Sequence, residues 1–191
     1  MKKKLKTLVI LYPNCVEFEI MLATELLNRT FPIEITTPLG KHHKGSNGMK
    51  IESDLAYSEV KIKNYKIVLV PGGDPYRIIN NKEIDSILQN AVKENKIIGA
   101  ICAGPFILAK AGILKGKKFT HGYGDLHKEY LDPFWEGAEF IDKNLIVDKN
   151  LVTAKAQGNV DFAAEILKLA GVVKDEEKER IQKFYKGLNK N

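Results

Sequence analysis

The residues that most clearly suggest chemistry surround Cys102. They read Gly99-Ala100-Ile101-Cys102-Ala103-Gly104-Pro105 and lie where an apolar run ends and a helical run begins. A strand that turns directly into a helix strains the turn residue and exposes its side chain, which requires small neighbours such as Ala100 and Gly104. The amino end of the helix favours negative charge, so we expect a Cys102 thiolate with a pKa below its usual range. The alternative is a small buried cysteine at a helix start.

A pair of glycines follows another apolar run, in the segment Val70-Pro71-Gly72-Gly73-Asp74. In an open parallel sheet, ligands bind outside the carboxyl ends of the strands, so this loop is expected to neighbour Cys102. The backbone N–H groups of Gly72 and Gly73 could then join that of Ala103 in an oxyanion hole for a carbonyl attacked by sulfur. The alternative is an ordinary turn between a strand and a helix.

Two carboxylates, Glu17 and Glu19, follow the first apolar run at the entry to a helix. Their loop reaches the same edge of the sheet, so one of them could hydrogen-bond Cys102. Such a pair shares a proton, which raises the pKa of the carboxyl group and suits it to acid-base catalysis. The alternative is that both carboxylates complement the positive end of the helix dipole.

Among the four histidines, His121 is the best placed to act as a base, because it follows a further short β-forming run. The alternative is a structural histidine. His42 and His43 lie in a turn-rich segment without a partner at metal-ligand spacing, so we expect both to be solvated and predict no metal site. For Cys15, a packed thiol is favoured over a thiol that resolves oxidised Cys102.

Short β-forming runs alternate with helical segments, and this alternation would position the residues above. It favours an α/β fold with an open, mostly parallel sheet between helices. The expected strands are 5–12, 33–37, 65–70 and 96–102, with hairpin-like pieces at 40–48 and 140–153. The expected helices are 19–28, 82–94, 106–111, 160–170 and 174–188, the last with an apolar stripe of Ile181, Phe184 and Tyr185.

The composition narrows the class of protein. A chain of 191 residues, 44% of them hydrophobic, suits one domain at 1–173 with a helical extension of it at 174–191. The 30 Lys and Arg outnumber the 24 Asp and Glu but are spread along the chain, so we expect no nucleic-acid partner. No apolar run reaches the length of a membrane span, and the start of the chain lacks a signal-peptide pattern. Only two cysteines favour a reducing cytoplasm.

Taken together, these motifs resemble the ThiJ/PfpI superfamily, and in particular its DJ-one-like branch, over 5–171. The likeness rests on the run 8–11 with the Glu-x-Glu after it, Val70-Pro71-Gly72-Gly73, Ala100-Ile101-Cys102-Ala103-Gly104-Pro105, Thr120-His121 and the segment 158–167. The resemblance implies a glutamine amidotransferase-like fold, a flavodoxin-like three-layer sandwich with a mostly parallel central sheet. It also implies a homodimer.

The same resemblance implies the site and its chemistry. It assigns catalytic roles to Cys102, Glu19 and His121, with Glu17 as second choice, and oxyanion or substrate binding to Gly72, Gly73 and Ala103. The implied protein is a cofactor-independent enzyme acting on small reactive carbonyl compounds, a glutathione-independent glyoxalase or deglycase. The alternatives are an amidase, hydratase or peptidase-like hydrolase of the same family, or a redox-responsive chaperone or sensor that uses oxidation of Cys102. Protease-like members have His after the nucleophile, whereas this chain has Ala103, which argues against that peptidase type.

Overall fold

A seven-stranded sheet forms the centre of the structure, a computed structural model that describes residues 4–122 and 132–188. Its strands are β1 (Lys6–Ile10), β3 (Ile33–Thr37), β6 (Leu55–Ala56), β7 (Tyr65–Val70), β9 (Ile97–Ile101), β12 (Leu145–Asp148) and β13 (Leu151–Ala154). They run in the order β12-β13-β9-β7-β1-β3-β6, and every neighbouring pair is parallel except β12 and β13. The predicted mostly parallel sheet is confirmed.

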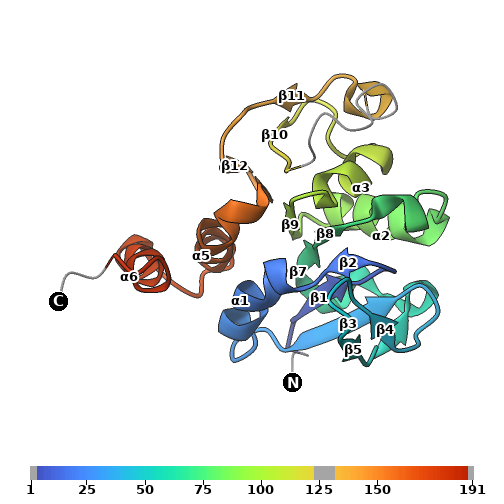
Figure 1. Cartoon of the computed structure of the whole chain (residues 1–191), viewed down its shortest axis with the longest axis horizontal. Coiled ribbons are helices and arrows are strands. Elements are labelled where there is room, and N and C mark those ends of the chain that lie inside the picture. The colour runs from blue at the N-terminus through green and yellow to red at the C-terminus, as the bar shows by residue number, and fades with distance from the viewer. Residues whose placement is uncertain (1–3, 123–131, 189–191) are drawn as a thin grey trace.

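Helices cover both faces of this sheet (Figure 1). On one face α1 (Phe18–Leu27) packs against α5 (Asn159–Leu169), and on the other α2 (Lys82–Lys93) packs against α3 (Gly104–Lys110). Strands covered on both faces need continuous apolar sequence, and in β7 the four residues from Ile67 to Val70 are fully buried. The carboxyl ends of β1, β7 and β9 therefore converge at one edge, where the loops that follow them meet.

Short elements complete this edge and its surroundings. Short strands form three further pairs: β2 (Cys15–Val16) pairs with β8 (Gly72–Gly73), β4 (His43–Lys44) with β5 (Lys50–Ile51), and β10 (Lys118–Phe119) with β11 (Glu139–Phe140). The 3₁₀ turns are η1 (Tyr57–Glu59), η2 (Ile62–Asn64), η3 (Pro75–Ile78), η4 (Asp132–Trp135) and η5 (Ala156–Gly158). The pairing of β2 with β8 brings the first loop against the paired glycines, which no local pattern in the sequence indicates.

The predicted boundaries differ from the observed ones at a few ends. The helix expected at 106–111 already begins at Gly104, because Pro105 has a backbone conformation suited to a first helical turn. The piece expected at 140–153 contains a hairpin of β12 and β13, and Lys149 takes a positive φ of 56° in its turn. The hairpin adds β13 to the central sheet beside β9, so it helps to support the edge where Cys102 lies.

The last helix, α6 (Asp175–Tyr185), lies against α5 and away from α2 and α3 (Figure 1). Three ionic contacts join this segment to α5: Lys178 Nζ lies 2.9 Å from Glu165 Oε2, Lys186 Nζ lies 2.6 Å from Asp161 Oδ1, and Asp175 Oδ1 lies 2.5 Å from Lys168 Nζ. Phe184 remains largely exposed on this helix. The apolar stripe predicted for this segment is therefore only partly covered by the rest of the chain.

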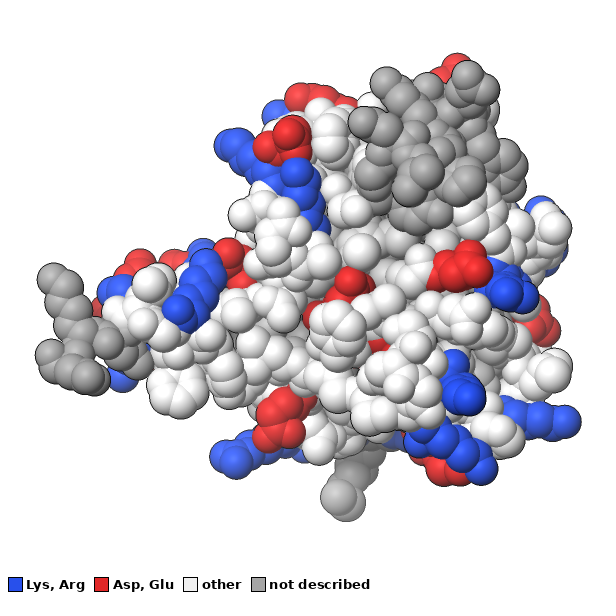
Figure 2. Space-filling model, viewed as in Figure 1, with Lys and Arg blue, Asp and Glu red and all other residues white. Residues whose placement is uncertain are grey.

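Charged side chains are scattered over the face seen in Figure 2, where Lys and Arg form small separate groups with acidic residues among them. None of the helices in the ranges 4–122 and 132–188 is long and apolar enough to cross a membrane.

Candidate functional site

Cys102 occupies a sharp turn between β9 and α3. Its φ is +58°, a left-handed conformation that costs a residue other than glycine about 1–3 kcal/mol. Two hydrogen bonds stabilise this conformation: the Cys102 N–H donates to Ala154 O at 2.8 Å, and the Cys102 carbonyl accepts from Gly122 N–H at 2.9 Å. The side chain is half-buried, so the sulfur lies at an accessible edge of the core. The predicted strained elbow is confirmed.

Glu19 is the carboxylate that the structure brings to Cys102. It lies in the first turn of α1, is only 4% exposed and forms a hydrogen bond with the Cys102 thiol. Its Oε2 also accepts a hydrogen bond of 2.9 Å from the Gly72 N–H. A Cβ atom on Gly72 would lie 2.6 Å from both Glu19 Oε2 and Cys102 Cβ, so only glycine leaves room for this arrangement.

Burial raises the pKa of both acids in this pair. For Glu19 burial raises the pKa, and the hydrogen bonds from Cys102 and Gly72 only partly oppose it. For Cys102 burial, followed by the negative charge of Glu19, raises the pKa of the thiol to about 12. The prediction that the pKa of the Cys102 thiol lies below its usual range is therefore wrong when Glu19 is ionised. Burial and the charge of Glu19 outweigh the opposing effect of the hydrogen bond from the Ala103 amide. The predicted direction for the carboxyl pKa is confirmed.

The three expected backbone donors have different surroundings. The Ala103 N–H forms a hydrogen bond with the Cys102 sulfur, which favours negative charge there. The Gly72 N–H is already bonded to Glu19, so in this state it orients the carboxylate rather than a substrate. Gly73 pairs with Cys15 in the β2–β8 ladder and has a φ of +120°, which glycine adopts without strain.

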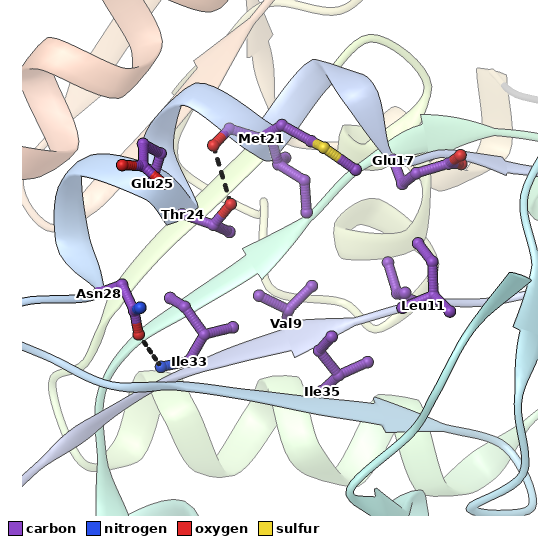
Figure 3. A pocket seen from close by; sticks show the side chains of 11 residues that line it. Val9, Leu11, Glu17, Met21, Thr24, Glu25, Asn28, Ile33 and Ile35 are labelled. Carbon is purple, nitrogen blue, oxygen red and sulfur yellow. Dashed lines mark hydrogen bonds between the residues drawn. The ribbon is translucent and has the colours of Figure 1, made fainter. Parts of the chain in front are cut away.

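Glu17 points to a different part of the molecule. It is 2% exposed and lies at one end of a pocket of about 290 Å³ between α1 and strands β1 and β3, with Val9, Leu11 and Ile35 among the lining residues (Figure 3). Neither of its carboxyl oxygens has a hydrogen-bond partner in the described part of the chain. The structure therefore favours Glu19 over Glu17 as the neighbour of Cys102.

A second thiol lies close to Glu17. Cys15 is fully buried, and its Sγ lies 3.3 Å from Nε2 of His43, which is 5% exposed. Burial raises the pKa of the Cys15 thiol to about 12 and lowers the pKa of His43. The prediction that His43 is solvated is wrong, because β4 brings it over the first loop; His42 is exposed as expected. The packed-thiol interpretation of Cys15 is confirmed.

His121 lies beside the elbow in an aromatic stack. Its ring is parallel to that of Trp135, with centroids 5.2 Å apart, and it also contacts Phe119 and Phe140. The next residue, Gly122, lies against Cys102: a Cβ on it would be 3.6 Å from the sulfur. The structure thus places His121 in the neighbourhood of the elbow, while its role as a base stays a prediction.

Sequence reasoning missed two residues of this neighbourhood. Tyr12 is fully buried at the end of the first apolar run, and its hydroxyl reaches the carbonyl oxygens of Pro71 and Gly72 at 2.9 and 2.8 Å. Trp135, the single tryptophan, stacks on His121. A polar-tipped aromatic at the carboxyl end of a central strand was the available signal for Tyr12, whereas nothing local indicated Trp135.

Within 4–122 and 132–188, no three His, Cys, Asp or Glu side chains are grouped so that they could hold a metal ion. What the site offers is a thiol, an adjacent carboxyl group that can hold a proton, and backbone N–H groups. This set suits attack on an electrophilic carbon with local proton transfer.

Comparisons with known proteins bear on the family and the fold. A model of the DJ-1/PfpI family matches residues 5–169. Protein dj-1beta of Drosophila melanogaster is 30% identical over 188 residues, which is 95% of each chain. The crystal structure of Drosophila melanogaster DJ-1beta superposes with a TM-score of 0.78 and 27% identity, covering 95% of this chain and 97% of that one. The fold is flavodoxin-like, as expected from the sequence.

Two further relatives have names that describe an activity. Deglycase PfpI of Pyrococcus furiosus is 32% identical over 117 residues, which is 61% of this chain and 68% of that protein. Glutathione-independent glyoxalase DJR-1.2 of Caenorhabditis elegans is 29% identical over 172 residues, 85% of this chain and 87% of that protein.

Proposed function

This chain belongs to the DJ-1/PfpI family, and from that premise we propose that it is a cysteine-dependent enzyme acting on small reactive carbonyl compounds, of the glutathione-independent glyoxalase or deglycase type. Relatives at about 30% identity are named deglycase and glyoxalase, which supports an enzymatic activity. The observation that carries the proposal is the hydrogen bond between the thiol of Cys102, in its strained elbow, and the carboxyl group of Glu19.

The first step needs a thiolate beside a protonated carboxyl group. Because the pKa of Glu19 is raised by burial, this group keeps its proton to higher pH than a solvated glutamate. When Glu19 is protonated, its charge no longer raises the pKa of Cys102, and the Ala103 N–H stabilises the thiolate. In the reactive form, therefore, Glu19 holds the proton and Cys102 carries the charge.

The substrate reaction follows from these positions. The Cys102 sulfur adds to the aldehyde carbon of a 2-oxoaldehyde, the carbonyl electron pair moves to oxygen, and the alkoxide takes the proton of Glu19. Ionised Glu19 then removes the C–H proton from the former aldehyde carbon, and the neighbouring ketone oxygen takes a proton from His121, which gives an enediol. Glu19 returns its proton to the neighbouring carbon while the hydroxyl on the former aldehyde carbon gives its proton to His121, which leaves a thioester of a 2-hydroxy acid. Water hydrolyses this thioester and frees Cys102. Gly73 and Ala103 are the proposed donors to the oxyanion, and His121 is the proposed second proton carrier.

The test is turnover of methylglyoxal without glutathione, with lactate as the measured product. The wild type and Cys15→Ser should both form lactate, whereas Cys102→Ser should lose at least about 10³-fold in rate. Absence of lactate from the wild type would reject the glyoxalase form of the proposal. A deglycase is then tested by release of free amine from methylglyoxal-treated N-acetyl-lysine, with the same variants.

We also propose a homodimer in a reducing compartment such as the cytoplasm. Phe184 and Leu188 are 64% and 63% exposed at the end of the chain, and exposed apolar groups of this kind favour association. Sedimentation in reducing buffer should give a dimer at micromolar concentration, and a chain that ends at Val173 should associate less. A monomeric intact chain would reject the dimer, and an unchanged dimer after truncation would exclude a contribution from α6.

A further inference from the structure

The peptide unit between Pro71 and Gly72 is held at both ends by buried side chains. Its carbonyl oxygen accepts a hydrogen bond of 2.9 Å from the Tyr12 hydroxyl, and its N–H donates one of 2.9 Å to Glu19 Oε2. In a planar trans peptide these two groups point in opposite directions, so a rotation of this unit would break both hydrogen bonds together. The Tyr12 hydroxyl and the Glu19 carboxyl group therefore hold the same peptide in one orientation.

Tyr12 is well suited to this task because it remains a neutral donor. It is fully buried, and its hydroxyl also lies 2.8 Å from the Gly72 carbonyl oxygen, so that it bridges two successive carbonyl groups. Burial, and then the neighbouring acids Cys15 and Glu19, raise the pKa of Tyr12 well above its usual range. A buried tyrosine hydroxyl needs such a partner, and two are present here.

The Gly72 N–H acts directly on the proton that Glu19 and Cys102 share. Its hydrogen bond favours ionised Glu19, against the effect of burial, and ionised Glu19 in turn raises the pKa of Cys102. A hydrogen bond accepted by the Pro71 carbonyl polarises the peptide and strengthens the N–H as a donor at its other end. The hydroxyl of Tyr12 is thus linked to the sulfur through one peptide and one carboxyl group.

We propose that Tyr12 is a positioning residue that, by holding the Pro71–Gly72 peptide, determines how the proton is divided between Glu19 and Cys102. This inference rests on the proposed function only in taking Cys102 and Glu19 as the reactive pair. Tyr12 acts through Gly72 and need not touch the substrate.

The test is the pH dependence of Cys102 alkylation by iodoacetamide, followed by mass spectrometry of the Cys102 peptide. Tyr12→Phe keeps the buried ring and removes only the hydroxyl. The Gly72 N–H is then less well oriented, Glu19 keeps its proton to higher pH, and Cys102 ionises with less repulsion. The midpoint of alkylation should move down by about half a pH unit to one unit, which is about a three- to tenfold faster reaction below the midpoint.

Tyr57→Phe is the matched control. Tyr57 is 2% exposed, and its hydroxyl donates to the Leu11 carbonyl at 2.7 Å rather than to the glycine loop. The Tyr57→Phe substitution should leave the midpoint of Cys102 alkylation unchanged. The shift caused by Tyr12→Phe should also disappear when Glu19→Gln is already present, because the proton-sharing carboxyl group is then gone.

The proposal is overturned if Tyr12→Phe has the wild-type midpoint, if Tyr57→Phe shifts it equally, or if the shift persists with Glu19→Gln. Should Tyr12→Phe fail to fold, site-specific replacement of Tyr12 by 3-fluorotyrosine, a stronger donor, decides the question: the midpoint must move up, and no movement rejects the proposal. Alkylation requires no turnover, so these outcomes stay separate from the test with methylglyoxal.

Discussion

The two thiols of this protein lie against the same pair of glycines, Cys102 beside Gly72 and Cys15 beside Gly73. Burial raises the pKa of each thiol to about 12, so this property does not distinguish them. They differ in access and in their neighbours. Cys102 is half-buried beside a carboxyl group that accepts a hydrogen bond, whereas Cys15 is fully buried against His43.

The comparison indicates which neighbours would let Cys102, rather than Cys15, act as the proposed reactive thiol. Glu19 is ordered by a backbone N–H and can exchange a proton with Cys102. The carboxylate near Cys15, Glu17, has no hydrogen-bond partner among the described residues and lines a pocket under α1 instead. We therefore expect changes around Cys102 to alter chemistry and changes around Cys15 to alter stability.

The largest difference should appear in alkylation of the native protein. Iodoacetamide should modify Cys102 on the order of 10²- to 10³-fold faster than Cys15, because a fully buried thiol reacts only after local opening. The two modified peptides can be quantified by mass spectrometry over time. In denaturant the two rates should become similar, and similar rates in the native state would contradict the comparison.

Substitutions of the two carboxylates should differ in their effect on kcat/KM by nearly as large a factor. Glu19→Gln should lower kcat/KM by about 10²-fold, because an amide keeps a hydrogen-bond donor but cannot transfer the proton. Glu17→Gln, the matched variant one half-turn away, should stay within about threefold of the wild type. Steady-state kinetics with methylglyoxal decide this, and the reverse result would move the catalytic role to Glu17.

Two glycines lie against these carboxylates, Gly72 beside Glu19 and Gly45 beside Glu17. Their substitution by alanine should change the activity by factors that differ less than those of the two carboxylates. On Gly72 a Cβ would lie 2.6 Å from Cys102 Cβ and 3.0 Å from the Ala103 nitrogen, so Gly72→Ala should lower activity by at least about tenfold. On Gly45 the three atoms nearest to such a Cβ all belong to the carboxyl group of Glu17, the far end of a flexible side chain, with Oε2 at 2.1 Å. Gly45→Ala should therefore retain activity. Kinetics together with thermal unfolding of both variants test this, and full activity in Gly72→Ala would refute it.

The smallest effect concerns pH and the Cys15 region. Burial lowers the pKa of His43 in the folded protein, so the unfolded chain binds a proton at higher pH than the folded chain does. The free energy of unfolding should fall as the pH decreases from the usual range of histidine toward the lowered value. His43→Gln should make this dependence shallower, whereas His42→Gln, at the exposed neighbour, should not. Denaturant unfolding at pH 7, 6 and 5 provides the measurement, and identical slopes in both variants would exclude His43 as the source.

Much of this arrangement follows from local sequence. The small residues around Cys102 predict the elbow, and the apolar runs predict β7, β9 and the parallel sheet. Glu17 and Glu19 could not be separated from spacing alone, because two residues in a helix differ by about 200° in direction and the start of α1 decides which one faces the sulfur.

The remaining features depend on contacts between distant segments. The pKa of the Cys102 thiol is raised by burial and by the charge of Glu19, which lies 83 positions earlier in the chain. The contact of Cys15 with His43 requires β4 to lie over the first loop, 28 residues away. The position of Tyr12 against Pro71 likewise joins residues separated by 59 positions. None of these pairings leaves a periodic signal in the sequence.

The two hydrogen bonds to the backbone of Cys102 also constrain the order of folding. One partner, Gly122, follows Cys102 by 20 residues, and the other, Ala154, follows it by 52. During synthesis from the amino end, the cysteine therefore leaves the ribosome long before the groups that stabilise its left-handed conformation. Because contacts between distant segments cannot form before both segments are made, we expect Cys102 to be an ordinary thiol in the nascent chain and the elbow to be completed only after β13 has joined the sheet.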